Sequence, residues 1–183
     1  PDVSFSARGA SPDGARVAVT SNEGTGQSHA MILDAATGQL RGLAPTPWEQ
    51  SSGAVSPDGR AMLVSTGIDG RKALALVDMG SGAERPLPLP EGVNSTLSSD
   101  PFSPDGTRLL ATHSGADAPT ELYAVNLASG TVEPVTRLAL ASLQQANLPK
   151  SRIVTYRSYD GSLVSGVLTM PFNLQRDGSN PAV

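Results

Sequence analysis

The sequence predicts an all-β chain of about three four-stranded blades of a β-propeller. The tetrapeptide Ser-Pro-Asp-Gly begins at positions 11, 56 and 103, so successive copies start 45 and 47 residues apart. A second turn signal, in which Ser or Thr precedes Gly, ends at Gly38, Gly82 and Gly130, which lie 24, 23 and 24 residues after the Gly of the first signal. Repeats of roughly 40–50 residues are typical of propellers and solenoids. The lack of helical periodicity favours a propeller over a helical solenoid.

The first turn signal has the composition of a tight hairpin turn. Ser suits the first position of a type I turn, Pro fixes φ at the second, Asp fits the third, and Gly accepts the positive φ that follows. We therefore predict that Asp13, Asp58 and Asp105 form turns and are neither catalysts nor metal ligands. The alternating acidic pattern of a calcium loop is absent around them.

Each repeat contains four short runs that favour strands, bounded by these turns. The first repeat predicts strands at 6–10, 16–20, 30–33 and 39–43. The second predicts strands at 52–55, 60–65, 72–77 and 84–89. The third predicts strands at 100–102, 107–112, 121–127 and 131–136. Because aromatic residues are only 4% of the chain, the core is expected to consist of Val, Leu, Ala and Ile.

The repeat stops near Arg137, and a different organisation follows. The domains predicted are blades over 1–137 (repeats near 1–44, 45–90 and 91–137), a linker over 138–151, and a distinct unit over 152–183. Residues 138–147 could form a short helix ended by Pro149. Two strands, 153–157 and 163–170, then flank Asp160-Gly161, a strong hairpin signal.

Composition excludes several classes of function. The net charge is −4 and no basic run exists, so neither nucleic acid nor a membrane is a predicted partner. Cys is absent, which excludes disulfides and thiolate metal sites. The chain starts abruptly at Pro1 and stops abruptly at Val183, and we expect it to be a segment of a longer protein.

The tail after the blades resembles the prolyl oligopeptidase family of serine peptidases, with the acylaminoacyl-peptidase and dipeptidyl-peptidase branches as the nearest. The family joins its propeller to a strand pair of the form Tyr-x-Ser-x-Asp-Gly … Gly-x-Leu-x-x-Pro. That pattern is matched here by Tyr156, Ser158, Asp160, Gly161, Gly166, Leu168 and Pro171. The resemblance implies that 152–183 is the N-terminal hairpin of a truncated α/β-hydrolase domain.

The catalytic elements of such a domain are missing from this chain. A nucleophile elbow reads Gly-x-Ser-x-Gly, but the single pair of Gly residues four apart, Gly38 and Gly42, has Leu40 between them. The resemblance places the oxyanion loop and the Ser, Asp and His of the triad after Val183. We therefore predict no catalytic, cofactor-binding or metal-binding residue in this chain, and no cofactor.

A few single residues have side chains that could take part in catalysis, substrate binding or domain contacts. His29 and His113 stand at strand edges, where we expect structural or solvated side chains and not a catalytic base. Trp48 is expected to pack between blades, although it could line a peptide-facing surface. Glu49 could contact a substrate amine in the dipeptidyl-peptidase manner, but no matching motif surrounds it. Arg152 and Arg157 flank the junction, where an interdomain ion pair is plausible.

The resemblance implies a non-catalytic propeller segment of a serine-type oligopeptidase or exopeptidase that hydrolyses short peptides by acyl transfer. The segment would filter substrates by size and act as an interdomain scaffold. Its expected partners are short peptides, the remainder of the same protein, or another copy. The expected location is the cytoplasm or the bacterial periplasm, with the cytoplasm favoured. The alternative is a non-enzymatic propeller of the same repeat that binds protein partners. A metal-dependent propeller hydrolase would need a ring of carboxylates, and no such cluster stands out.

Overall fold

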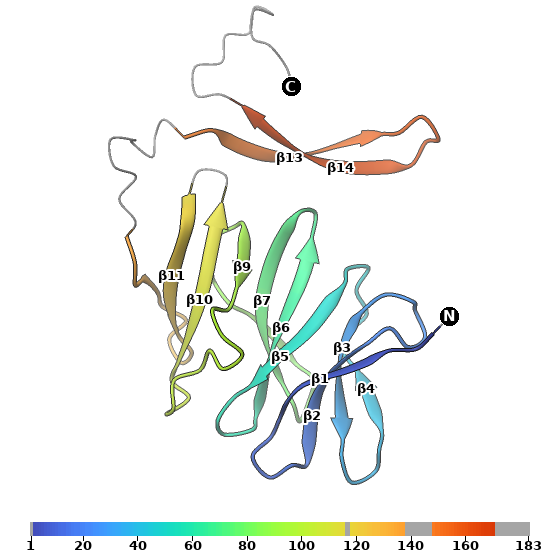
Figure 1. Cartoon of the computed structure of the whole chain (residues 1–183), viewed down its shortest axis with the longest axis vertical. Coiled ribbons are helices and arrows are strands. Elements are labelled where there is room, and N and C mark those ends of the chain that lie inside the picture. Colours follow the sequence, from blue (N-terminus) through green and yellow to red (C-terminus); the bar gives the residue numbers. More distant parts are fainter. Residues whose placement is uncertain (1, 116–117, 138–147, 171–183) are drawn as a thin grey trace, which may run out of the picture.

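The structure, a computed structural model, describes residues 2–115, 118–137 and 148–170. Within these ranges the chain is all β, and no helix is present that could cross a membrane. The strands form a body of stacked sheets and a two-stranded hairpin that lies beyond one end of the body (Figure 1). The short helix expected over 138–147 falls outside the described residues.

The first sheet is a four-stranded antiparallel meander in the order β1-β2-β3-β4. Its strands are β1 (Phe5–Ala10), β2 (Arg16–Ser21), β3 (His29–Asp34) and β4 (Leu40–Gly42). A register shift between Ala7 and Gly9 places a bulge in β1.

The second sheet has eight strands and consists of two further antiparallel meanders. Its strands are β5 (Gln50–Val55), β6 (Ala61–Ile68), β7 (Arg71–Asp78), β8 (Glu84–Pro86), β9 (Val93–Ser95), β10 (Arg108–Gly115), β11 (Ala118–Asn126) and β12 (Val132–Pro134). One parallel bridge, Lys72 to Val93, links the meander β5–β8 to the meander β9–β12. This succession of antiparallel meanders is consistent with segments of a propeller.

The three Ser-Pro-Asp-Gly segments form the predicted turns with the same hydrogen bonds. In each, the Gly amide donates to the Ser carbonyl at 2.8 Å, and the Ser hydroxyl donates to the Asp carboxylate at 2.5–2.6 Å. The Gly φ angles are 69°, 70° and 68°, in the left-handed region that favours glycine. The Ser hydroxyl is the largest cause that lowers the pKa of Asp13 and Asp58. The pKa of Asp105 is lowered to about 2, first by the Ser103 hydroxyl and then by the amide and hydroxyl of Thr107. The prediction that these carboxylates form turns is confirmed.

The second turn signal is also held by a carboxylate or amide oxygen. The Oδ1 atoms of Asp34, Asp78 and Asn126 each accept hydrogen bonds from the amides two and three residues further on. These bonds lower the pKa of Asp34 and Asp78, with the amides of Thr37 and Ser81 as the largest causes. This is an Asx turn, and the residue that nucleates it stands four positions before the Gly of the signal.

The core lies between neighbouring meanders and follows the alternation of β6. Met62 and Val64 point to the first sheet, into a cluster with Ala18, Ala30, Ile32, Val77 and Met79. Leu63 points to the opposite side, into a cluster with Leu74, Leu76, Leu87, Phe102, Leu109, Ala111 and Val125. Both faces of this meander are therefore buried, which explains why β6 reads as a nearly continuous apolar run.

Turns of neighbouring meanders also touch. A Cβ on Gly59 would lie 2.8 Å from Cδ of Pro12, whereas a Cβ on Gly106 would lie 3.7 Å from Cδ of Pro57. The Pro of one turn thus packs on the Gly of the next, and the close approach at Gly59 requires a residue without a side chain.

The first strand of the third meander differs from the prediction of 100–102. It forms earlier, as β9, and in the predicted range a single bridge joins Phe102 to Leu109. Pro101 lacks the amide that a ladder needs, although its carbonyl accepts from Leu110 at 2.9 Å. The outer strands β4, β8 and β12 are also shorter than predicted, and β8 ends at Pro86, where Pro86 and Pro88 interrupt the run of donors.

The hairpin consists of β13 (Lys150–Arg157) and β14 (Leu163–Met170), paired in continuous register. β13 begins inside the range predicted as linker. Its turn repeats the chemistry of the first turn signal, because the Gly161 amide donates to the Ser158 carbonyl at 2.9 Å and the Ser162 amide donates to Asp160 Oδ1 at 2.9 Å. The Ser162 amide is also the largest cause that lowers the pKa of Asp160.

Candidate binding cavity between the sheets and the hairpin

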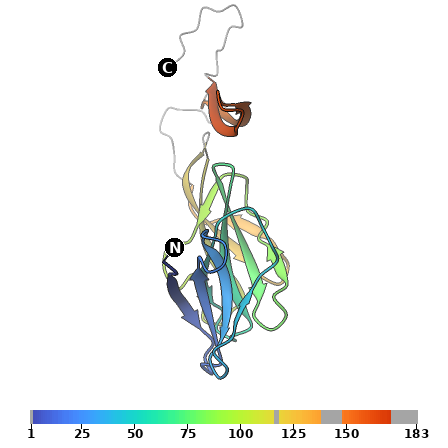
Figure 2. The ribbon, with the colours of Figure 1, turned by 90° about the vertical axis from the view of Figure 1, so that its right-hand side faces the viewer.

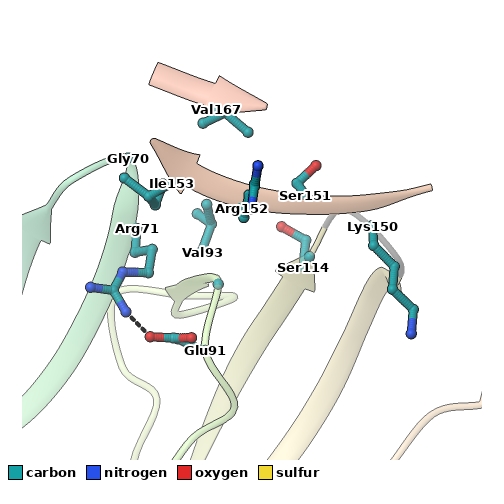
Figure 3. A pocket seen from close by; sticks show the side chains of 12 residues that line it. Gly70, Arg71, Glu91, Val93, Ser114, Lys150, Ser151, Arg152, Ile153 and Val167 are labelled. Atoms are coloured by element: carbon teal, nitrogen blue, oxygen red, sulfur yellow. Dashed lines mark ion pairs between the residues drawn. The ribbon is translucent and has the colours of Figure 1, made fainter. Parts of the chain in front are cut away.

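A cavity of about 680 Å³ lies where the ends of the stacked sheets face the β13–β14 hairpin (Figure 3). Figure 2 shows the hairpin seen along its length beyond that end of the sheets. The sheet wall contributes Gly70, Arg71, Glu91, Gly92, Val93, Ser114 and Gly115. The hairpin wall contributes Lys150, Ser151, Arg152, Ile153 and Val167.

The turn between β6 and β7 brings the sheet wall to the hairpin. It consists of Asp69 and Gly70, with φ of 45° and 73°, as expected for a two-residue type I′ turn. The Ser165 hydroxyl donates to Asp69 Oδ1 at 3.0 Å. A Cβ on Gly70 would lie 3.6 Å from Val167 and 3.7 Å from Ile153, so the turn packs against the apolar side of the hairpin.

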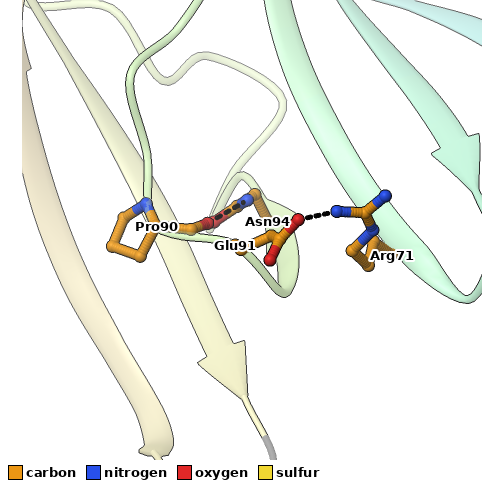
Figure 4. A network of polar contacts seen from close by, with 4 residues as sticks. All are labelled: Arg71, Pro90, Glu91 and Asn94. Carbon is orange, nitrogen blue, oxygen red and sulfur yellow. Dashed lines mark hydrogen bonds and ion pairs between the residues drawn. The ribbon is translucent and has the colours of Figure 1, made fainter. Parts of the chain in front are cut away.

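Arg71 follows this turn and forms an ion pair with Glu91 (Figure 4). The side chain of Arg71 is 38% exposed and that of Glu91 is 77% exposed. The Arg71 Nε atom is buried and has no hydrogen-bond partner. A hydrogen bond holds the loop that carries Glu91 in place: Asn94 Nδ2 donates to the Pro90 carbonyl at 3.0 Å.

His113 belongs to the support of this loop. Its ring is buried, Nδ1 lies 2.9 Å from Asn94 Oδ1, and the Tyr123 ring packs against it at an interplanar angle of 87° and a centroid distance of 5.8 Å. A Cβ on Gly92 would lie 2.7 Å from the His113 ring, so the loop passes directly over the imidazole. His113 is thus a buried residue that packs under the loop and is hydrogen-bonded to Asn94. The next residue, Ser114, lines the cavity.

His29, Trp48 and Glu49, which were singled out in the sequence, lie apart from the cavity lining. His29 starts β3 and is half-buried, Trp48 is half-buried, and Glu49 is exposed directly before β5. The Trp48 amide donates to Thr46 Oγ1 at 3.2 Å, a local turn contact. The packing of Trp48 between blades stays a prediction, as does the assignment of no catalytic residue to this chain.

Among the residues that the structure describes, Arg152 and Arg157 form no ion pair, and the polar contact between sheets and hairpin is that of Ser165 with Asp69. Arg157 donates to the Gly161 carbonyl within its own hairpin at 2.9 Å, and Arg152 is an exposed residue of the cavity wall. Among the described residues, the ion pair at the cavity is formed by Arg71 and Glu91. No periodic or motif signal in the sequence marks these two residues, because Arg71 stands at the first position of β7 and Glu91 lies in the loop before β9.

The cavity offers positive charge, hydroxyl groups and an apolar patch. In the described part of the chain, no three His, Cys, Asp or Glu side chains are grouped so as to hold a metal ion. The arrangement of the lining residues suits the binding of a polar, negatively charged group beside an aliphatic one.

The described residues therefore form an all-β fold in which stacked antiparallel meanders are followed by a hairpin. No protein-family model and no curated protein matches the sequence. Solved structures match it closely in fold. Oligopeptidase B from Trypanosoma brucei is 16% identical, with a TM-score of 0.78 over 98% of this chain and 26% of its own. A prolyl endopeptidase is 18% identical, with a TM-score of 0.76 over 96% of this chain and 25% of its own.

A third solved structure, TolB from Acinetobacter baumannii, is 17% identical and covers 88% of this chain and 39% of its own at a TM-score of 0.55. The chain thus spans about a quarter of the length of the two peptidases. At these identities the likeness defines the fold, which is that of propeller segments in such proteins.

Proposed function

We propose that this chain is a non-catalytic segment of a serine peptidase of the prolyl oligopeptidase family. Residues 1–137 would be three propeller blades, 138–151 the linker, and 152–183 the first strands of the α/β-hydrolase domain. The observation that carries the proposal is that the fold match to the peptidases extends over 96–98% of this chain, so it includes the hairpin after the sheets.

The free face of the third meander supports the presence of further blades. Three residues occupy the same position in the repeat, seven residues after the Ser of each Ser-Pro-Asp-Gly segment: Ala18, Leu63 and Leu110. The first two are 0% and 4% exposed because the next meander covers them, whereas Leu110 is 42% exposed. An uncovered apolar position of this kind favours burial against another sheet.

In the proposed protein the segment would restrict access and hold the two domains together. The acyl transfer would be carried out by a Ser nucleophile, a His base and an Asp that orients it, all outside this chain. The peptide substrates would be short, because a folded protein cannot pass the ring of blades. The contact between Ser165 and Asp69 would be one of the points where the domains meet.

The test is active-site labelling with a fluorophosphonate. The protein that carries this chain is expected to react with one equivalent of the probe, and the 183-residue chain alone is expected not to react. The same protein should cleave peptides of about ten residues and leave folded proteins intact. Stoichiometric labelling of the isolated chain, or no labelling of the whole protein, would refute the proposal.

A second candidate is a non-enzymatic propeller that binds protein partners, and the likeness to TolB favours it. The coding sequence after Val183 discriminates between the two. A His-Gly-Gly segment followed by Gly-x-Ser-x-Gly supports the peptidase, while further Ser-Pro-Asp-Gly repeats or a stop codon supports the binding module. A panel of acylated peptides and dipeptide conjugates would then separate the two peptidase branches.

A further inference from the structure

We propose that the cavity between the sheets and the hairpin binds a peptide carboxylate, with Arg71 and Arg152 as its cationic groups. The inference rests on the proposed function in that the ligand is a peptide. The binding site is made by one wall from the sheets and one wall from the hairpin.

The charge of the lining is opposite to that of the molecule. The cavity is lined by Arg71, Lys150 and Arg152 against a single acid, Glu91. The chain as a whole has 17 acidic and 13 basic residues. A cleft that concentrates one sign of charge raises the local concentration of ligands of the other sign. An anionic group is therefore drawn to this place on a molecule that otherwise repels it.

Arg71 has an unused donor. Its Nε–H is buried without a partner, and a buried unsatisfied N–H is costly unless a ligand, ion or water accepts from it. Its Nη1 pairs with Glu91, whose side chain is 77% exposed (Figure 4). Exposed ion pairs of this kind are weak. A ligand carboxylate that reaches this edge of the guanidinium can accept from Nε–H and Nη2–H together, the bidentate geometry that Arg favours, while Glu91 stays on Nη1.

The remaining lining defines what surrounds the carboxylate. Ser114 projects from the sheet wall and supplies a hydroxyl group (Figure 3), whereas the Ser151 hydroxyl of the hairpin wall lies 2.7 Å from Thr169 Oγ1 and is hydrogen-bonded to it. Val93, Ile153 and Val167 supply apolar surface beside them. A carboxylate next to an aliphatic side chain, as at a C-terminal Leu or Val, matches this arrangement. The Lys150 side chain extends away from Arg71 in the same view, so we assign it no direct contact.

The test is equilibrium binding of uncleavable probes to the intact protein, without turnover. The probe is an N-methylated Gly-Gly-Leu tripeptide as the free acid, and the matched probe is its C-terminal amide. We expect the free acid to bind about tenfold more tightly than the amide, since a charge-assisted bidentate pair is lost, and its affinity to fall as salt rises. A third probe carries Asp inside an amidated peptide. If it binds like the free acid, the site recognises any peptide carboxylate; if it does not, the site recognises the C terminus.

Variants locate the binding. Arg71→Gln and the exposed Arg152→Gln should each weaken binding of the acid by about tenfold and leave that of the amide unchanged. Arg71→Lys keeps the charge and should recover only part of the affinity. The matched control is Arg137→Gln, an exposed arginine that does not line the cavity. Equal binding of acid and amide, or full affinity in both glutamine variants, would overturn the inference. Fluorophosphonate labelling of the same variants reports the proposed peptidase separately.

Discussion

Arg41 of β4 donates two hydrogen bonds across the boundary between meanders, from Nη2 to the Met79 carbonyl at 2.9 Å and from Nη1 to the Gly80 carbonyl at 2.8 Å. Arg85 repeats the contact at the next boundary, donating to the Leu127 carbonyl at 2.8 Å. The two arginines occupy equivalent registers in β4 and β8. The third meander has Glu133 at this register.

Replacement of this arginine should weaken the first boundary. Arg41→Gln removes both bonds to the second meander, and we expect a loss of about 1–2 kcal/mol in the free energy of unfolding. Urea denaturation measures it, with Arg8→Gln as the control because Arg8 is exposed on β1. If the two variants share one midpoint, the contact does not contribute to stability.

Two glycines of the same turn type separate backbone strain from packing. Gly59 and Gly14 have φ of 70° and 69°, but a Cβ at Gly59 meets Cδ of Pro12 at 2.8 Å and a Cβ at Gly14 meets nothing within 4 Å. Both alanine variants therefore carry the left-handed strain of about 1 kcal/mol. Gly59→Ala should lose roughly 1–3 kcal/mol more, from overpacking. Thermal or urea unfolding of the pair is the measurement, and equal losses would contradict the turn-on-turn contact.

The turn carboxylates should make stability depend on pH in acid. The folded-state pKa of Asp105 is lowered from 3.8 to about 2, so this group favours the folded state at pH values above 3.8 and loses that contribution as the pH falls towards 2. Ser103→Ala removes the largest cause of the shift and should raise the pKa of Asp105. Carboxyl NMR titration of Asp105 checks this directly. An unchanged titration in the Ser103 variant would show that the amide and hydroxyl of Thr107 suffice.

Asp69 combines an unusual backbone conformation with the contact to the hairpin. Asp69→Gly tolerates the positive φ but loses the bond from Ser165, whereas Asp69→Ala loses the bond and keeps a Cβ in the left-handed region. We expect faster amide hydrogen exchange in β14 for both variants and lower global stability for alanine alone. Unaltered exchange in β14 of the glycine variant would mean that Ser165 and Asp69 do not hold the hairpin.

The sequence predicted the turns well because their residue types have few alternatives. Ser-Pro-Asp-Gly specifies one turn by a fixed φ at Pro, a positive φ at Gly and a short acceptor at Asp, and all three copies form it. The apolar runs between the turns predicted the inner strands for the same local reason. Asp69-Gly70 carries the two-residue hairpin signal, but the predicted strands at 60–65 and 72–77 left a longer connection between them than the structure has.

Long-range geometry explains what the sequence left out. β9 pairs with β10 upstream of the predicted strand, because pairing depends on the partner strand and not on local propensity. The cavity joins the start of β7, the loop before β9, the end of β10 and the start of β13. These segments are far apart in the chain, and their lining residues follow no motif. His113 shows the same limit, since its role depends on Asn94 and Tyr123.

The β6–β7 ribbon contacts three parts of the molecule: the two core clusters and the β13–β14 hairpin. At one end its side chains enter both core clusters, through Met62 and Val64 on one face and Leu63 on the other. At the far end its Asp69-Gly70 turn bears on the hairpin. One ribbon thus connects both inter-sheet cores to the hairpin, so a displacement of its turn would be felt on both faces of the central meander.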